Sequence, residues 1–320
     1  MAKKIVTIGG GSGQFILLSS LRDQLNIKIT GIVSMVDSGG STGRLRDEYG
    51  VLPPGDILKC ILALAPNRNL ARQILQKRFQ ANSRLKGHVV GNMLLTILSQ
   101  YTFSFPKAVK ALGEILHIKG QVLPVTICRA TLTAELEDGS WLFGESAIDV
   151  PKSKKRAKIL RTLLVPHHSD DIKVYPPVIK ALERADYLFI GPGDLYTSIT
   201  PNFLVKGVME AITHSKAKKI YLCNIMTKFG ETDNFKVSDF VTTIEKFIHC
   251  RLDIVIINST KPSLQIIKKY QKEHSQLVKN DLSTFQPNFE IISHDLLNDK
   301  GGIIRHDYHK LADLIKRIIV

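Results

Sequence analysis

The first 37 residues contain the pattern that most constrains the fold: a strand, a glycine-rich turn, a helix and a second strand. KKIVTIGGGSG is a short apolar run that ends in glycines, and QFILLSSLRDQL follows with apolar residues at helical spacing. IKITGIVSMV, residues 27–36, is a second apolar run rich in β-branched residues, and it ends at Asp37. A strand, a glycine loop, a helix and a parallel strand form a right-handed βαβ unit of the doubly wound type.

The rest of the chain continues this alternation, with two changes of pattern. From 54 to about 118 the apolar spacing is helical. From 120 to about 150 the residues alternate and include a turn-forming DG pair, which is typical of an antiparallel meander. Strand, loop and helix patterns return from ADYLFIGPGD onward. We therefore expect one α/β domain over residues 1–320. It is Rossmann-like and doubly wound, with a mainly parallel sheet, a helical subregion and an antiparallel β insertion at about 120–150.

Composition favours a globular cytoplasmic protein. Apolar residues make up 44% and charged residues 23% of the chain, which excludes general disorder. The apolar run behind the N-terminal lysines is too short for a signal peptide or a membrane span. The four cysteines are scattered without a C-x-x-C pair, as in proteins of a reducing compartment. We therefore expect free thiols, a cytoplasmic location and no membrane contact.

The net charge of +15 raises the question of nucleic acid. The densest basic segment, PKSKKRAKILR at 151–161, comes with no zinc-finger spacing and no RNA-recognition signature. We therefore expect a solvated basic loop that leads into a helix, and a nucleic-acid partner is not favoured. A basic protein also attracts anionic small molecules to a cleft, so a phosphorylated ligand suits this charge.

Three glycine-bearing loops follow apolar strands, and the carboxyl ends of parallel strands meet at one edge of a sheet. In the first loop, Gly10, Gly11, Ser12 and Gly13 precede a helix whose free N–H groups can bind phosphate. Gln14 stands where a dinucleotide fingerprint requires glycine, and no Gly-Lys-Ser/Thr follows. These residues leave two alternatives open, a phosphate-bearing ligand and a tight structural turn.

The second loop is DSGGSTGRLRDEYGVLPPGD. Its first residue, Asp37, lies where dinucleotide folds place an acid that binds ribose. Gly40 and Ser41 belong to a run of backbone and hydroxyl donors, and Arg44 offers charge-assisted bonds to phosphate. Asp56 is either a helix cap or, with Asp37, a ligand of Mg²⁺ held against a diphosphate.

The third loop, GPGDLYTSITPN, follows the apolar run YLFI. It offers backbone N–H groups and two neighbouring hydroxyls to an anion or a ribose. Its candidate contact residues are Gly191, Gly193, Asp194, Tyr196, Thr197, Ser198 and Asn202.

The segment PHHSDD at 166–171 contains residue types that ligate metals. Adjacent His167 and His168 on a loop cannot easily face one centre, and no spaced partner is evident. We expect no metal site there.

Six segments carry a family resemblance: TIGGGSG, DSGGSTGRLRDEYGVLPPGD, GHVVGN, GPGDLYTSITPN, CNIMTKFGET and IRHD. Together, and over essentially the whole chain, they resemble the gluconeogenesis factor family, which is related to 2-phospho-L-lactate transferase. The resemblance implies a Rossmann-like cytoplasmic protein that binds nucleotide sugars such as UDP-N-acetylglucosamine. Such proteins support cell shape and wall synthesis during growth on gluconeogenic carbon sources. The transferase relatives move a phospholactyl group from a guanosine diphosphate donor to a deazaflavin, with a divalent metal.

The resemblance also implies site residues. The first two glycine loops would approach the ligand's phosphates, and Asp37 and Asp56 match acidic positions that would hold metal in the transferases. His88 and Asn92, one helical turn apart, would face the same cleft. The remaining candidates, at the rim or in contact with phosphate or sugar, are Asn224, Thr227, Arg305 and His306.

Two positions depart from the family pattern. Ser38 stands where the family commonly has a second consecutive acid, which removes a metal ligand and weakens a catalytic interpretation. Asp194 stands where Ser is common, which indicates a bound cation or a different orientation of the ligand. We therefore expect a non-catalytic nucleotide-sugar binding regulator. The alternative is a metal-dependent phospholactate-type transferase that uses a nucleotide diphosphate-linked donor. A homodimer is compatible with such a fold.

Overall fold

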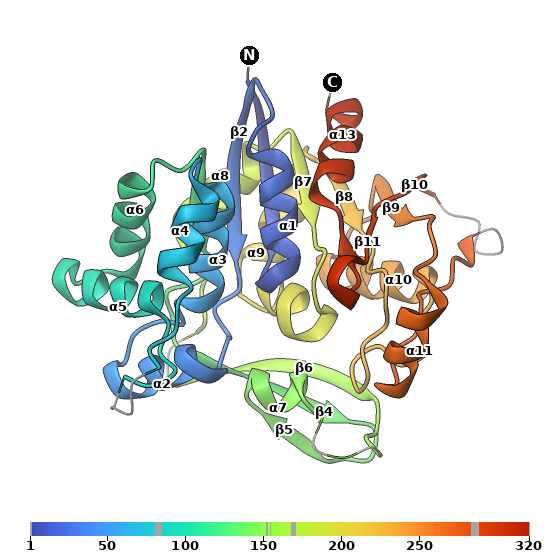
Figure 1. The fold of residues 1–320 in the computed structure, drawn as a ribbon, viewed down its shortest axis with the longest axis horizontal. Coiled ribbons are helices and arrows are strands. Elements are labelled where there is room, and N and C mark those ends of the chain that lie inside the picture. The colour runs from blue at the N-terminus through green and yellow to red at the C-terminus, as the bar shows by residue number, and fades with distance from the viewer. Residues whose placement is uncertain are drawn as a thin grey trace.

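A parallel sheet forms the centre of the molecule in the computed structural model. The structure describes residues 2–80, 85–151, 153, 155–167, 171–282 and 288–319. Seven strands of these residues pair in the order β10-β9-β8-β7-β1-β2-β3 (Figure 1), and every neighbouring pair is parallel. Their bounds are β1 (Lys3–Gly9), β2 (Ile27–Val33), β3 (Gln121–Pro124), β7 (Tyr187–Ile190), β8 (Lys218–Leu222), β9 (Ile254–Asn258) and β10 (Glu290–His294). The strand order reverses between β1 and β7, which is where open α/β sheets bind ligands.

Helices cover both faces of this sheet, as a Rossmann-like doubly wound fold requires. Figure 1 shows α1 (Gly11–Leu21) and α13 (Tyr308–Ile318) side by side in front of the sheet. Right-handed crossovers place α8 (Pro176–Glu183), α9 (Val208–His214) and α10 (Val237–Ile248) on the opposite face. Strands buried on both faces read as continuous apolar runs, which explains segments such as YLFI and IVII.

A helical subregion lies between β2 and β3, as predicted. It consists of α2 (Gly40–Tyr49), α3 (Gly55–Leu64), α4 (Arg68–Leu75), α5 (Val90–Thr102) and α6 (Phe105–Ile115). The Cβ that Gly91 lacks would lie 2.6 Å from a methyl carbon of Leu58, so this glycine lets α5 pack closely against α3. The remaining short elements are α11 (Leu264–Lys272), β11 (Leu297–Asn298), β12 (Arg305–His306) and helical turns at Leu195–Ile199, Thr200–Asn202 and Lys300–Gly302.

The antiparallel sheet has different bounds from those predicted. It consists of β4 (Ala130–Leu136), β5 (Trp141–Phe143) and β6 (Ile159–Pro166), in the order β5-β4-β6, and α7 (Glu145–Asp149) packs on it. The start of the predicted meander, Gln121–Pro124, is instead the edge strand β3 of the parallel sheet.

The prediction that the basic segment leads into a helix is wrong, because β6 follows it. The sheet pairs β4 with β6, and alternating residues of β4 together with Ile159 of β6 face a small core around Ile148 and Val36. Local spacing could not reveal this pairing across 22 intervening residues.

The four cysteines are free thiols: Cys60 and Cys223 are buried, and Cys128 and Cys250 are half-buried. Within the described ranges, no helix is long and apolar enough to cross a membrane.

Candidate functional site

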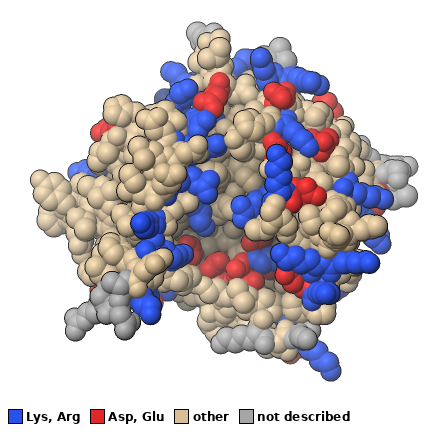
Figure 2. Space-filling view, viewed as in Figure 1, with Lys and Arg blue, Asp and Glu red and all other residues tan. Residues whose placement is uncertain are grey.

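Loops at the carboxyl ends of β1, β7 and β8 enclose a cavity of about 430 Å³, which we call the main cavity. Figure 2 shows a hollow on this face, with acidic side chains at its floor and lysine and arginine side chains around it. The sequence-predicted residues that line the main cavity are Gly10, Gly11, Ser12, Gly13, Asp37, Asp56, Gly193, Asp194, Thr197, Ser198, Asn224, Thr227, Arg305 and His306. The structure thus brings together residues from all three glycine loops at the point where the strand order reverses.

The first glycine loop contacts the third. A Cβ on Gly13 would lie 2.1 Å from the carbonyl oxygen of Pro192, so no side chain fits there. Gly13 therefore serves the packing of the two loops, in addition to lining the main cavity. The N-terminus of α1 begins at Gly11, and its N-cap, Gly10, offers no side-chain acceptor. The first-turn N–H groups of α1 are therefore left to a ligand or to water.

Asp37 and Asp56 both approach glycine backbones at the main cavity. A Cβ on Gly55 would lie 2.6 Å from Asp37 Oδ2, and a Cβ on Gly10 would lie 2.8 Å from Asp56 Oδ2. Burial, with the charge of Asp56 as the second cause, raises the pKa of Asp37. Asp56 lies in the first turn of α3, not at its N-cap, and accepts a hydrogen bond from Lys59 Nζ at 2.9 Å.

These two carboxylates fit a divalent cation. Glycine leaves room for each carboxylate to face the cavity, and hard cations such as Mg²⁺ prefer carboxylate and phosphate oxygens. Asp37 and Asp56 would hold the ion, which would neutralise charge on a bound diphosphate. Lys59 already neutralises part of the charge of Asp56, so a bound ion would share that carboxylate with it.

Glu145 brings a carboxylate to the position beside Ser38. The Ser38 N–H donates to Glu145 Oε2 at 3.3 Å, and the Ser146 N–H donates to Ser38 Oγ at 3.0 Å. Burial and then the charge of Asp37 raise the pKa of Glu145 to about 7. Glu145 of α7 thus supplies a carboxylate next to Ser38, the position where the resemblance led us to expect a second acid.

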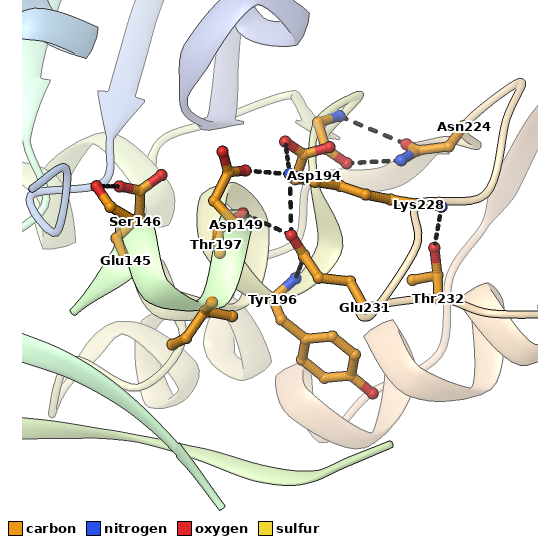
Figure 3. A network of polar contacts seen from close by, with 12 residues as sticks. Glu145, Ser146, Asp149, Asp194, Tyr196, Thr197, Asn224, Lys228, Glu231 and Thr232 are labelled. Carbon is orange, nitrogen blue, oxygen red and sulfur yellow. Dashed lines mark hydrogen bonds and ion pairs between the residues drawn. The ribbon is translucent and has the colours of Figure 1, made fainter. Parts of the chain in front are cut away.

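Lys228 joins three segments of the chain through carboxylates, as Figure 3 shows. Its Nζ donates to Asp149 Oδ1, to Asp194 Oδ2 at 2.8 Å and to Glu231 Oε1 at 3.0 Å. Asp149 belongs to α7, Asp194 to the third glycine loop, and Glu231 to the loop after β8. Asp194, which from the sequence indicated a bound cation or a different orientation of the ligand, pairs with this lysine in the structure.

Glu231 is the buried anchor of this network. Its carboxylate accepts hydrogen bonds from the Tyr196 N–H at 3.1 Å and from Thr197 Oγ1 at 3.2 Å. Burial raises its pKa to about 7, although Lys228 acts in the opposite direction. Tyr196 therefore positions the third loop through its backbone, and it lies outside the lining of the main cavity.

Two asparagines hold the third loop in place. Asn224 Nδ2 donates to the carbonyl of Gly193 at 2.8 Å. Asn202 Nδ2 donates to the carbonyls of Ser198 and Ile199 at 2.9 and 3.0 Å. Asn202 and Gly191 lie outside the lining of the main cavity, so their contribution is to the shape of the loop.

The predicted residues of β12 and of the loop after β8 differ in what they can offer a ligand. Burial lowers the pKa of His306 to about 4, so this side chain is neutral at pH 7 and brings no positive charge to a phosphate. Arg305 is exposed at the cavity and keeps that capacity. Thr227 Oγ1 accepts from the Gln276 N–H at 2.9 Å, which ties its hydroxyl to a neighbouring loop.

Gly40, Ser41 and Asn92 line a second cavity, which shares only Asp37 and Lys59 with the main cavity. We call it the side cavity.

His88 and Arg44 lie outside the lining of both cavities. His88 precedes α5 instead of occupying its first turn, and its Nδ1 lies 3.3 Å from Ser41 Oγ. Arg44 is exposed and donates to the carbonyl of Lys86 at 2.8 Å.

Within 166–171, His168, Ser169 and Asp170 lie outside the described residues. The neighbouring His167 has its Nε2 2.8 Å from Thr131 Oγ1.

Sequence reasoning missed five charged residues of the site. They are Lys59, Glu145, Asp149, Lys228 and Glu231. Lys228 and Glu231 lie inside the quoted segment CNIMTKFGET, where a Lys-x-x-Glu spacing next to a strand end was an available signal. Glu145 and Asp149 could not be found locally, because only the packing of the antiparallel sheet brings them to the cavity.

The fold and the cavity define a Rossmann-like α/β protein with a polar cavity at the carboxyl edge of its parallel sheet. The family model described as 2-phospho-L-lactate transferase CofD matches residues 5–297. A putative gluconeogenesis factor of Thermotoga maritima is 42% identical over 98% of this chain and 99% of its own length. The gluconeogenesis factor of Bacillus subtilis is 37% identical over 98% and 96%. A crystal structure of a Bacillus halodurans protein superposes with a TM-score of 0.91 at 35% identity, covering 99% of this chain and all of that one. The chain belongs to the gluconeogenesis factor family, and the CofD model matches most of its length.

Proposed function

We propose that this protein binds a nucleotide sugar of the UDP-N-acetylglucosamine type in the main cavity and acts as a regulator, without turnover. In this proposal it is a cytoplasmic protein that supports cell shape and wall synthesis during gluconeogenic growth, as its family resemblance implies. The observation that carries the proposal is the convergence of the three glycine loops on one cavity at the reversal of strand order.

The charges of the main cavity support a diphosphate ligand that binds together with a cation. The carboxylates that line it belong to Asp37, Asp56, Glu145, Asp149 and Asp194, and the cations to Lys59, Lys228 and Arg305. A chain of net charge +15 thus presents an excess of acids at this one place. Mg²⁺ between these acids and a diphosphate removes the repulsion, because it coordinates both kinds of oxygen.

Isothermal titration calorimetry tests this proposal. We expect UDP-N-acetylglucosamine to bind in the presence of Mg²⁺, and to bind more weakly after chelation of the metal. GDP and UDP, compared in the same experiment, identify the preferred base. Absence of binding at millimolar ligand, with and without Mg²⁺, would rule the proposal out.

A phospholactate-type transferase is the second candidate. It is favoured by Glu145, which places a carboxylate with a pKa of about 7 beside Asp37 and so offers a general base near the candidate metal position. The test is phosphorus NMR of a nucleotide diphosphate-linked phospholactate donor incubated with the protein, a deazaflavin acceptor and Mg²⁺. Release of nucleotide above the buffer rate would replace the regulatory proposal, whereas binding without release would support it.

A further inference from the structure

The side cavity has a volume of about 430 Å³ and lies against the N-termini of three helices. Its lining includes Gly40 at the start of α2, Gly55 at the start of α3, and Val89, the N-cap of α5. The N-cap side chains of these helices make no capping hydrogen bond. At α5 the first N–H groups are already used, because the Val89 N–H donates to Ser41 Oγ at 3.1 Å and the Val90 N–H to the carbonyl of Lys77 at 3.0 Å. The N-termini of α2 and α3 therefore offer N–H groups, and all three helices direct partial positive charge, to whatever occupies the cavity.

Cations outnumber carboxylates among the described residues that line the side cavity, whereas carboxylates outnumber cations in the main cavity. Lys59 and Arg78 line it, and Asp37 is the one carboxylate among the described residues of its lining. Arg78 is held by a hydrogen bond from its Nη1 to the carbonyl of Gly87 at 2.8 Å. An oxyanion therefore needs no metal ion to bind in the side cavity.

Asn92 gives the observation that is independent of the helix N-termini. It is 3% exposed and lines the side cavity, yet its Oδ1 has no hydrogen-bond partner among the residues that the structure describes. Its Nδ2 donates to Thr42 Oγ1 at 3.3 Å, and the Thr42 hydroxyl in turn bonds to Asp37. This chain fixes the amide so that Oδ1 is the free atom. Buried acceptors in native proteins almost always have a donor, so Asn92 Oδ1 is available to accept a hydrogen bond from a ligand hydroxyl or N–H in the side cavity.

On the basis of the proposed function, we propose that the side cavity is a second ligand subsite, which binds a phosphate or carboxylate on a group that also carries a hydroxyl. The helix N-termini and Arg78 bind the anion, and Asn92 Oδ1 accepts the hydroxyl. Because the two cavities share Asp37 and Lys59, such an anion lies beside a nucleotide bound in the main cavity. It is either the far end of a nucleotide-linked ligand or a separate small metabolite.

Calorimetry with Mg²⁺ present distinguishes these two sources. UDP, UDP-glucose and UDP-glucuronate compare a nucleotide alone, a neutral sugar and a sugar acid. Inorganic phosphate and glycerate 3-phosphate, added to free and to UDP-loaded protein, probe a separate anion. We expect either UDP-glucuronate to bind at least about tenfold more tightly than UDP-glucose, or one of the free anions to bind with a measurable constant.

Variants locate the effect in the side cavity. We expect Asn92→Asp and Arg78→Gln each to weaken the anion-dependent binding by about tenfold or more, and to leave the affinity for UDP unchanged. Arg78 is exposed, so its variant remains informative if Asn92→Asp does not fold. Lys77→Gln is the matched control: it removes a neighbouring exposed charge outside both cavities and should have no effect.

The outcomes separate this inference from the proposed function. If UDP binds, but neither the sugar acid nor the free anions show any preference or any response to the variants, the subsite is disproved while the nucleotide site stands. If UDP does not bind, the proposed function fails, and binding of phosphate or glycerate 3-phosphate that is lost in Arg78→Gln still supports the subsite.

Discussion

At the scale of single residues, Lys228 is the side chain on which most of the site's electrostatics depends. One ammonium group donates to three carboxylates that come from three segments of the chain. Breaking a partly buried ion pair by removal of one partner leaves uncompensated charge, which costs more than the pair itself contributes. Lys228 therefore stabilises the arrangement of α7 against the third glycine loop.

Lys228→Met should lower the free energy of unfolding by roughly 3 kcal/mol, because three carboxylates lose their cation. One carboxylate oxygen of each acid, Asp149, Asp194 and Glu231, lies within 4.8 Å of those of the other two, as in a cation site. We therefore expect Ca²⁺ to restore part of the stability of this variant in urea denaturation. Adding Glu231→Gln should abolish the restoration. Equal stability of Lys228→Met and the wild type would contradict this account of the network.

Glu145 gives a pH dependence with a definite sign. Its pKa is raised from 4.5 to about 7 in the folded state, chiefly by burial, so the folded protein binds a proton that the unfolded chain has lost. This group therefore stabilises the folded state less as pH rises from about 4.5 to 7. Glu145→Gln should raise stability at pH 8 relative to the wild type by the order of 2 kcal/mol, with little difference at pH 4.

The difference between the two proteins, followed by urea denaturation from pH 4 to pH 8, isolates Glu145 from other titrating groups. His306, whose pKa is lowered to about 4, acts in the opposite direction but equally in both proteins. A difference in stability that does not change with pH would contradict the raised pKa.

The candidate acids of the second loop could be foreseen at this scale, and their partners could not. Asp37 follows an apolar strand and Asp56 comes directly after the Pro-Pro-Gly that begins a helical pattern, which the sequence makes visible. The approach of Glu145 to Ser38 joins residues 107 positions apart. No local sequence pattern can reveal a contact of this range. The interpretation that Ser38 weakens a metal site therefore did not include the carboxylate of Glu145 beside it.

At the scale of elements, the glycine loops shape the site as much as they line it. Gly13 lets the start of α1 pack against the turn after β7, because no side chain has room at this position. Gly40 has φ +46 and nothing within 4 Å of where its Cβ would be. A glycine is favoured there because of its left-handed backbone conformation, not because of a close contact. Two glycines in similar sequence surroundings thus have different physical roles.

Gly13→Ala should destabilise the protein by roughly 3 kcal/mol, because the added methyl group would lie 2.1 Å from a backbone carbonyl oxygen. Gly9→Ala is the matched control. A Cβ there would meet atoms of Gln14 at 3.6 Å or more, so we expect a change below about 1 kcal/mol. Thermal and urea denaturation measure both. Similar stabilities of the two variants would contradict the proposed contact between the loops.

The parallel sheet and its helices could be predicted from the sequence, because buried strands and amphipathic helices carry their own periodicities. The antiparallel sheet was harder, since β3 and β4 differ in partner but not in local pattern. The strand β6 follows a run of lysines and arginines, and only its pairing with β4 identifies it. The bounds of the antiparallel sheet depend on long-range strand pairing, and local β propensity could not reveal them.

At the scale of the whole molecule, the distribution of charge is the property most relevant to function. The chain has a net charge of +15, yet its main cavity has more carboxylates than cations. A basic surface attracts anions from solution, and an acidic floor accepts them only with a cation in between. Ligand binding and divalent cation binding are therefore expected to be coupled.

Asp37→Asn tests this coupling in solution. The variant should bind a UDP-sugar with an affinity that no longer depends on Mg²⁺, whereas the wild type should gain at least about tenfold from the ion. Because Asp37 has a raised pKa, the variant should be at least as stable as the wild type at pH 8. Calorimetry at two Mg²⁺ concentrations measures the coupling. An undiminished Mg²⁺ effect in the variant would exclude Asp37 as a ligand of the ion.

The most direct test of the central claim is a crystal structure of the protein with UDP-N-acetylglucosamine and Mn²⁺, which replaces Mg²⁺ at oxygen-rich sites and is visible by anomalous scattering. We predict diphosphate density at the N-terminus of α1 in the main cavity, with an anomalous peak between the phosphates and the carboxylates of Asp37 and Asp56. An empty main cavity at millimolar ligand, or a nucleotide bound elsewhere on the molecule, would contradict the account.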